Sequence, residues 1–165
     1  MMQSLLWAAI VVLSATVALN LALTFAVIRR LRDTAATPAA SGPAAGGTVP
    51  SFTVAMTDGT TLTDRDLHSG AATIVFALPG CKPCTTTLAT LPGTEPTYVF
   101  VMGEPGEQGT GEVLAKAPAF ARTAVTPMDG PVGRAFGVTL FPTTVRVVDG
   151  VITEAGNGAL AGAGV

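Results

Sequence analysis

The chain has 165 residues, a formal net charge of −2, a mean hydropathy of +0.54 and charged side chains at only 12% of positions. This length allows one compact domain with short appendages. From residue 49 onward, six basic side chains stand against ten acidic ones, a net charge of −4 with no basic patch. This balance argues against a nucleic-acid partner.

The N-terminal region holds most of the apolar excess. Leu5 to Ile28 contains 24 residues without a charge, and a helix of that length spans roughly 36 Å, more than a hydrocarbon core of about 30 Å. A signal peptide would need a positive start and an apolar core of about 7–15 residues, but no charged side chain precedes residue 29. We therefore predict a tail at residues 1–4, an uncleaved transmembrane helix at 5–28, and a single-pass protein of the cell membrane.

Three polar residues within this span, Thr16, Asn20 and Thr24, follow one another at intervals of four and share a helix face. Such side chains either bond back to carbonyls of their own helix or bridge to another helix. The spacing leaves both interpretations open, and the second predicts a transmembrane partner contacted through this face.

Residues 29–48 follow as an arginine cluster and a linker. Arg29, Arg30 and Arg32 favour a cytoplasmic position for this flank by the positive-inside rule. The stretch from Asp33 to Thr48 is rich in Ala, Pro, Gly and Ser, and as a flexible coil it reaches roughly 20–24 Å. We therefore expect the following domain, residues 49–165, to stay near the bilayer and to act on membrane-proximal substrates.

Along that domain, segments with the apolar pattern of a strand alternate with segments that have the apolar pattern of a helix. We predict strands at 52–56, 72–78, 98–102 and 124–126, helical segments at 62–67, 82–91, 108–122 and 132–136, a hairpin of 143–148 with 151–154, and a short Gly/Ala-rich tail. This alternation predicts an α/β domain with a mixed central sheet flanked by helices.

The chain's only two cysteines, Cys81 and Cys84, follow the apolar strand at 72–78 and the breaker pair Pro79-Gly80. A Cys-x-x-Cys pair between a strand and a helix indicates a redox dithiol. The helix N-terminus stabilises a thiolate, and cysteines in this setting have pKa values of roughly 3.5–7.5 instead of about 8.5. Lys82 adds a positive charge beside Cys81, and the two residues between the cysteines, Lys82 and Pro83, are candidate modulating residues. Cys84 is placed to resolve a mixed disulfide at Cys81.

Two other interpretations of the cysteine pair are weaker. A structural zinc site needs four ligands, and beyond the two sulfurs the chain offers a single histidine, His68. A purely structural disulfide would close a tiny loop and restrict the unfolded chain little. We predict neither a metal nor a cofactor.

Three stretches resemble the thioredoxin superfamily, specifically its membrane-tethered TlpA/redoxin branch (AhpC/TSA-like) and the MauD-type proteins. They are the strand before the Cys-x-x-Cys motif, the Asp58-Gly59 start with Leu62 and Leu67, and the run Phe136-Gly137-Val138-Thr139-Leu140-Phe141-Pro142-Thr143. The similarity covers about residues 50–155 and implies a thioredoxin-like fold behind one N-terminal transmembrane helix.

The resemblance also implies a function. Pro142 would be a cis-proline facing the dithiol, and the backbone of Phe141 would pair with an extended substrate segment. The protein would reduce or isomerise disulfides of membrane-proximal proteins, with a thiol electron donor. Tethered relatives work outside the cytoplasm, and on that ground we expect an extracytoplasmic domain, against the arginine evidence.

The chain departs from the family pattern behind the dithiol. Val75 occupies the position of a buried acid, Ala77 that of a tryptophan and Ala89 that of a kink proline, while Thr85, Thr86 and Thr87 follow Cys84. A missing general base slows deprotonation of Cys84, so we expect a slow or specialised exchanger. Two alternatives remain: a redoxin-type antioxidant, against which Leu78 argues because peroxiredoxins carry Thr or Ser there, and a non-catalytic membrane adaptor.

Overall fold

The computed structural model describes residues 42–158 and, before them, residues 3, 7, 13, 14, 16–18 and 20–25. The chain divides into two compact units, Met1–Ala39 and Ala40–Val165. Much of the predicted transmembrane segment, the whole arginine cluster, most of the linker and the end of the C-terminal tail lie outside the described residues. Those predictions remain predictions.

In the first unit, residues 16–18 and 20–25 are helical. The Asn20 side-chain amide donates a hydrogen bond to the Thr16 carbonyl at 3.1 Å, and the Thr24 hydroxyl donates to the Asn20 carbonyl at 2.8 Å. These bonds run along the helix itself, as the first of the two interpretations predicts. No helix in the described part of the chain combines the length and the apolarity needed to cross a membrane.

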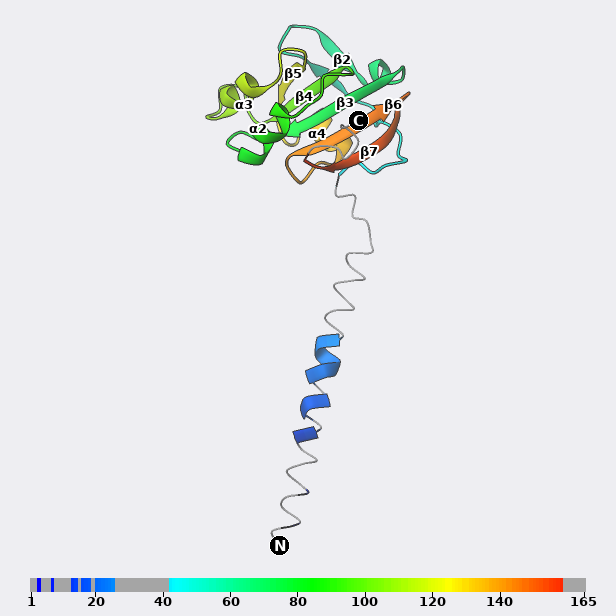
Figure 1. The fold of residues 1–165 in the computed structure, drawn as a ribbon, viewed down its shortest axis with the longest axis vertical. Helices are drawn as coiled ribbons and strands as arrows, with labels where there is room; N and C mark the ends of the chain where they lie inside the picture. The colour runs from blue at the N-terminus through cyan, green and yellow to red at the C-terminus, as the bar shows by residue number, and fades with distance from the viewer. Residues whose placement is uncertain are drawn as a thin grey trace. The chain divides into compact units, whose positions relative to one another are not determined.

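The second unit is built on a five-stranded sheet in the order β5-β4-β3-β6-β7 (Figure 1). The central β3 (Ala71–Ala77) is parallel to β4 (Thr97–Met102), which is parallel to β5 (Arg122–Thr126). On its other side, β3 is antiparallel to β6 (Thr143–Val148), which forms a hairpin with β7 (Val151–Asn157). The predicted mixed sheet is confirmed.

The remaining elements surround this sheet, and the strand β2 is the one that the sequence analysis did not predict. They are β1 (Thr53–Ala55), β2 (Thr61–Thr63), the 3-10 helix η1 (Asp64–Leu67), α2 (Lys82–Ala89), α3 (Thr110–Lys116) and α4 (Pro131–Phe136). β1 and β2 pair antiparallel as a separate two-stranded sheet. α3 is shorter than the predicted helix at 108–122, because Ala117 already has extended backbone angles.

Both faces of the sheet are buried, as the consecutive apolar residues 74–77 of β3 predict. On one face, Phe76 and Phe100 pack with Phe52 and Phe136, with ring centroids 5.2–6.2 Å apart. On the other face, Val75 packs in a second cluster; we call it the dithiol cluster, and its buried members are Val75, Ala77, Cys84, Leu88, Val99, Val101 and Val113. Because Cys84 and Leu88 come from α2, this helix covers the second face.

The segment just before Val49 joins the edge of the sheet. Gly46 N–H donates to the Ile152 carbonyl at 2.7 Å, and Ile152 N–H donates to the Gly47 carbonyl at 2.8 Å. Val49 N–H donates to the Gly150 carbonyl at 2.9 Å. The last residues of the predicted linker thus cover part of the outer edge of β7, which would otherwise expose unpaired backbone groups.

The β6–β7 hairpin confirms the prediction made from Asp149-Gly150. Asp149 has φ 49° and Gly150 has φ 77°, so both turn residues have the positive φ of a type I′ turn. A Cβ on Gly150 would lie 2.3 Å from Cδ2 of His68. His68 therefore packs against this turn, and β7 extends three residues beyond the predicted end of the hairpin.

Candidate functional site

The dithiol lies where β3 gives way to α2. Cys81 and Cys84 form a disulfide with an S–S distance of 2.03 Å. Cys81 is the N-cap of α2, with extended backbone angles, and its sulfur accepts the Cys84 N–H at 3.2 Å. The turn Pro79-Gly80 ends the strand, and Pro83 fits the first helical turn because its missing N–H would have no intrahelical partner there. The predicted position of Cys81 at the helix start is confirmed.

The two sulfur-bearing residues differ in exposure. Cys81 is half-buried, whereas Cys84 is fully buried in the dithiol cluster. Lys82 and Pro83, between them, are exposed. A disulfide with one reachable and one covered sulfur can be attacked from solvent only at the first.

The loop before β6 lies beside the dithiol. The Phe141–Pro142 peptide bond is cis, as the resemblance implies. Phe141 is half-buried and packs against the dithiol cluster, as Cys81 also does. Within residues 42–158, neither the N–H nor the carbonyl of Phe141 makes a backbone hydrogen bond, whereas the Pro142 carbonyl accepts Gly158 N–H at 3.1 Å. The backbone of Phe141 therefore offers a donor and an acceptor next to Cys81.

No buried carboxylate lies behind the dithiol among the described residues. Val75 is fully buried at the position where the resemblance would place an acid, and every buried polar side chain of the described chain is a threonine. The hydroxyls of Thr85 and Thr86 donate back to the Lys82 carbonyl at 2.8 and 3.3 Å. These two hydroxyls are therefore occupied within α2.

The loop between β4 and α3, residues 103–109, packs against the turn that precedes Cys81. A Cβ on Gly109 would lie 2.9 Å from the Gly80 nitrogen, and one on Gly103 would lie 2.9 Å from Cγ of Pro79. The loop is closed on itself by the Glu107 carboxylate, which accepts the Glu104 N–H at 3.0 Å. No motif in the sequence marked this loop. Its glycines nevertheless follow the strand next to β3, and the carboxyl ends of adjacent parallel strands meet at one edge of a sheet.

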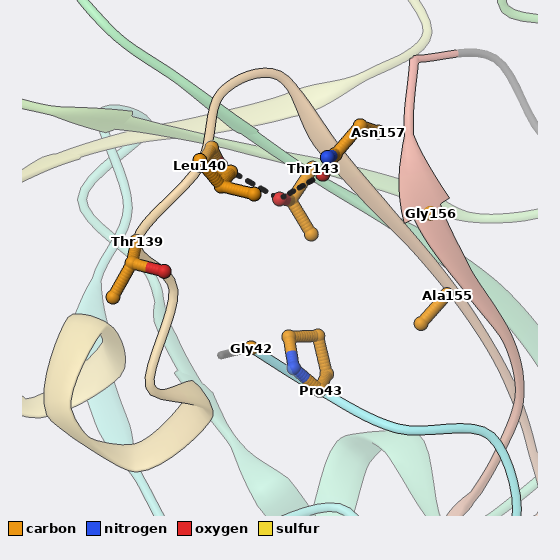
Figure 2. A pocket seen from close by; sticks show the side chains of 8 residues that line it. All are labelled: Gly42, Pro43, Thr139, Leu140, Thr143, Ala155, Gly156 and Asn157. Atoms are coloured by element: carbon orange, nitrogen blue, oxygen red, sulfur yellow. Dashed lines mark hydrogen bonds between the residues drawn. The ribbon is translucent and has the colours of Figure 1, made fainter. Parts of the chain in front are cut away.

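A small pocket of about 150 Å³ lies beside the Phe141-Pro142 loop (Figure 2). It is lined by Gly42, Pro43, Thr139, Leu140, Thr143, Ala155, Gly156 and Asn157. The Thr143 hydroxyl donates to the Leu140 carbonyl at 2.7 Å, which fixes the backbone of the loop, while the Leu140 side chain is 55% exposed. Leu140 thus presents an apolar surface next to the free backbone groups of Phe141.

The third possible metal ligand, His68, is not assembled with the cysteines. It contacts the β6–β7 turn, which lies beside the start of β3, whereas the cysteines follow the end of β3. Within the described ranges, no three His, Cys, Asp or Glu side chains are grouped to hold a metal.

Comparison with known proteins identifies the fold. No protein-family model matches the sequence, and no curated protein matches it either. Among solved structures, a protein assigned as the thiol:disulfide interchange protein DsbE of Chlorobium tepidum is 18% identical, with a TM-score of 0.59 over 72% of this chain and 89% of that one. The thioredoxin domain of a thiol-disulfide oxidoreductase from Bacteroides vulgatus is 16% identical, with a TM-score of 0.57 over 70% and 90%.

A thio-disulfide isomerase from Thermus thermophilus is also similar, at 25% identity and a TM-score of 0.54 over 72% of this chain and 89% of that one. The fold of residues 42–158 is therefore thioredoxin-like, as predicted. The Cys-x-x-Cys pair at the start of α2 and the cis-proline loop belong to this fold in the present chain.

Proposed function

We propose that this protein is a membrane-anchored thiol-disulfide oxidoreductase that uses the dithiol of Cys81-Lys82-Pro83-Cys84. One observation carries the proposal: a reachable Cys81 and a covered Cys84 are already joined as a disulfide at the N-terminus of α2. Unpaired N–H groups at that helix end stabilise the thiolate form of Cys81, which is the nucleophile.

The exchange follows from the different exposure of the two cysteines. In the reduced protein, the Cys81 thiolate attacks a substrate disulfide, forms a mixed disulfide and releases one substrate thiolate, which takes a proton from solvent. Cys84 then loses its proton, attacks the sulfur of Cys81 and releases the second substrate thiolate. Two electrons pass from the dithiol to the substrate, the Cys84 proton leaves to solvent, and solvent protonates the released substrate thiolates. A thiol donor must then restore the dithiol.

The Phe141 backbone supports a protein substrate. An extended segment of the substrate can pair with its free N–H and carbonyl, as in strand addition to a sheet. The exposed Leu140 side chain adds apolar contact beside this position. We therefore assign Phe141 and Pro142 to substrate binding, and Lys82 and Pro83 to tuning of the dithiol.

The anchor and its consequences extend the proposal. We assign residues 5–28 to a transmembrane helix, which keeps the domain and its disulfide substrates near the bilayer. The side chain at position 78, three residues before Cys81, is a half-buried leucine packed on the Phe76 side of the sheet. With no hydroxyl at that position, thiol-disulfide exchange is favoured over peroxide reduction.

Two cysteine variants test the proposal. Cys81→Ser is expected to abolish reduction of insulin disulfides, because the attacking thiolate is lost. Cys84→Ser is expected to accumulate a mixed disulfide with the substrate, visible as a mass increase that dithiothreitol removes. Undiminished insulin reduction by Cys81→Ser would contradict the proposal. A reduced dithiol that alkylates no faster than glutathione at neutral pH would favour a non-catalytic adaptor.

A further inference from the structure

The Thr144 hydroxyl is the only buried side-chain oxygen or nitrogen without a hydrogen-bond partner in the described part of the chain. Thr144 lies in β6 and is 1% exposed. Buried polar groups are almost always hydrogen-bonded, so an unpaired one calls for a physical explanation. Its position in the sheet suggests one.

Thr144 lies on the same face of the sheet as the dithiol cluster. It is directly opposite Val75 of β3 in the antiparallel register, and directly opposed residues project to one face. Val75 packs with Cys84 in the dithiol cluster. On its other side, Thr144 is opposite Gly156 of β7, and no atom lies within 4 Å of where a Gly156 Cβ would be. The hydroxyl therefore lies on the face of the sheet where Val75 and Cys84 pack, with open space on the Gly156 side.

The preceding residue behaves differently. Thr143 is opposite Phe76, on the other face, and its hydroxyl donates to the Leu140 carbonyl. The Thr143 hydroxyl therefore has a structural role in the loop, whereas the role of the Thr144 hydroxyl is still to be explained.

We propose that the Thr144 hydroxyl donates a hydrogen bond, directly or through one bridging water, to the Cys84 thiolate when the disulfide is open. The inference rests on the proposed function and adds a residue to its second step. In the disulfide form the Cys84 sulfur is bonded to Cys81 and carries no charge, so the hydroxyl has no anion to bind. After a mixed disulfide forms at Cys81, the Cys84 thiol must lose its proton to solvent before it can attack. A hydrogen bond to the charged form favours that form.

Thr144 thereby compensates in part for the acid that Val75 replaces. A threonine hydroxyl does not remove the proton as a base would. It lowers the free energy of the thiolate that remains in an otherwise apolar cluster. The hydroxyl acts on the sulfur of Cys84 and leaves the first attack by Cys81 unaffected.

The test measures the two steps separately. The reduced protein is mixed with oxidised glutathione, quenched with acid at intervals and separated by mass into reduced, mixed-disulfide and oxidised forms, over a range of pH. Thr144→Val keeps the side-chain shape without the hydroxyl, and it is expected to slow the second step about tenfold at neutral pH and to move its pH profile upward by about one unit. The first step is expected to stay unchanged.

Three further variants sharpen the result. Thr144→Ser keeps a hydroxyl and is expected to preserve the wild-type pH profile of the second step. Thr144→Ala removes the hydroxyl without the bulk of valine, and it should slow the second step as Thr144→Val does; this result would exclude a misfit of the valine as the cause. Thr97→Val, in β4, is the matched control. The Thr97 hydroxyl is also buried (4% exposed), but it has a partner, because it donates to the Glu95 carbonyl at 3.0 Å. Its second step should match the wild type.

An unchanged pH profile of the second step in both Thr144→Val and Thr144→Ala would overturn the inference while leaving the proposed function intact. If the wild-type protein never formed a mixed disulfide, the proposed function itself would fail, and the inference with it.

Discussion

Two glycines in the loop between β4 and α3 have similar φ angles but different surroundings. Gly106 has φ +84° and Gly109 has φ +90°. A Cβ on Gly106 would meet no atom within 4 Å, whereas one on Gly109 would lie 2.9 Å from the Gly80 nitrogen. Comparing the two positions therefore separates two contributions to the free energy of unfolding. One comes from a side chain on a left-handed backbone, and the other comes from close approach to the Pro79-Gly80 turn.

We expect Gly109→Ala to destabilise the protein more than Gly106→Ala does. Each substitution carries the left-handed penalty of about 1–2 kcal/mol. Gly109→Ala must also displace the backbone at Gly80, which adds about 1 kcal/mol or more to the destabilisation. This displacement also shifts Cys81, the residue directly after Gly80. Denaturant unfolding gives the free-energy difference, and alkylation of the reduced protein gives the reactivity of Cys81. Equal destabilisation by the two variants, with equal alkylation rates, would contradict the prediction.

The site residues differ in how far sequence could predict them. Cys81 and Cys84 were predictable because their motif is local, and the position of Phe141-Pro142 came from the resemblance. Gly109 and Thr144 could not be found in this way. The role of Gly109 depends on its contact with a turn 29 residues earlier, and that of Thr144 depends on the register between β6 and β3.

At the scale of elements, the short 3-10 helix η1 is held at its start by two hydrogen bonds from Thr63 to the Asp66 side chain. The Asp66 carboxylate accepts the backbone N–H of Thr63 at 2.7 Å and the Thr63 hydroxyl at 2.8 Å. These two hydrogen bonds, the backbone one first, lower the pKa of Asp66 below its ordinary value. η1 in turn buries Leu67, whose carbonyl accepts Gly150 N–H at 2.8 Å.

This cap predicts a pH-dependent contribution to stability. Because the pKa of Asp66 is lower in the folded state, its carboxylate stabilises the fold above the unfolded-state pKa of about 3.9, and the contribution is lost as pH falls through the folded value. Asp66→Asn should therefore cost about 0.5–1 kcal/mol near neutral pH and nothing at pH values below the folded pKa. Urea unfolding at both pH values measures the difference, with Asp64→Asn as control; a deficit that persists undiminished in acid would contradict the assignment.

The elements that sequence predicted well are those with strong local signals. β3 and β4 contain consecutive apolar residues at 74–77 and 98–102, and the β6–β7 turn has an Asp-Gly pair. β2 was missed because Thr61-Leu62-Thr63 is too short to show a period by itself and exists through pairing with β1. The pairing of residues 46–49 with β7 was missed for the same reason. A Gly-rich segment has no strand pattern of its own, and it takes an extended form here because β7 offers a partner.

At the scale of the whole molecule, the sequence assigns different physical tasks to its two ends. The first 28 residues carry no charged side chain, while the domain from residue 49 carries a net charge of −4. The Thr16, Asn20 and Thr24 face makes hydrogen bonds along its own helix, which lowers the cost of polar groups in lipid without requiring a partner helix. If residues 5–28 form the proposed transmembrane helix, we expect that helix to retain the full-length protein in the pellet after carbonate washing of membranes, without a partner helix.

For the proposed membrane-anchored protein, the side of the membrane on which the domain lies would decide its electron donor, and labelling of the dithiol can report that side. Cys81 and Cys84 are the only cysteines, so a membrane-impermeant maleimide added to intact cells after mild reduction can label the protein only there. Cys81 is half-buried and so within reach of the reagent, whereas Cys84 is fully buried. An extracytoplasmic domain, which the resemblance favours, predicts labelling of intact cells that Cys81→Ser greatly reduces. The arginine cluster predicts the opposite, labelling only after lysis, and that result would place the domain in the cytoplasm with a soluble thiol donor in place of one supplied through the membrane.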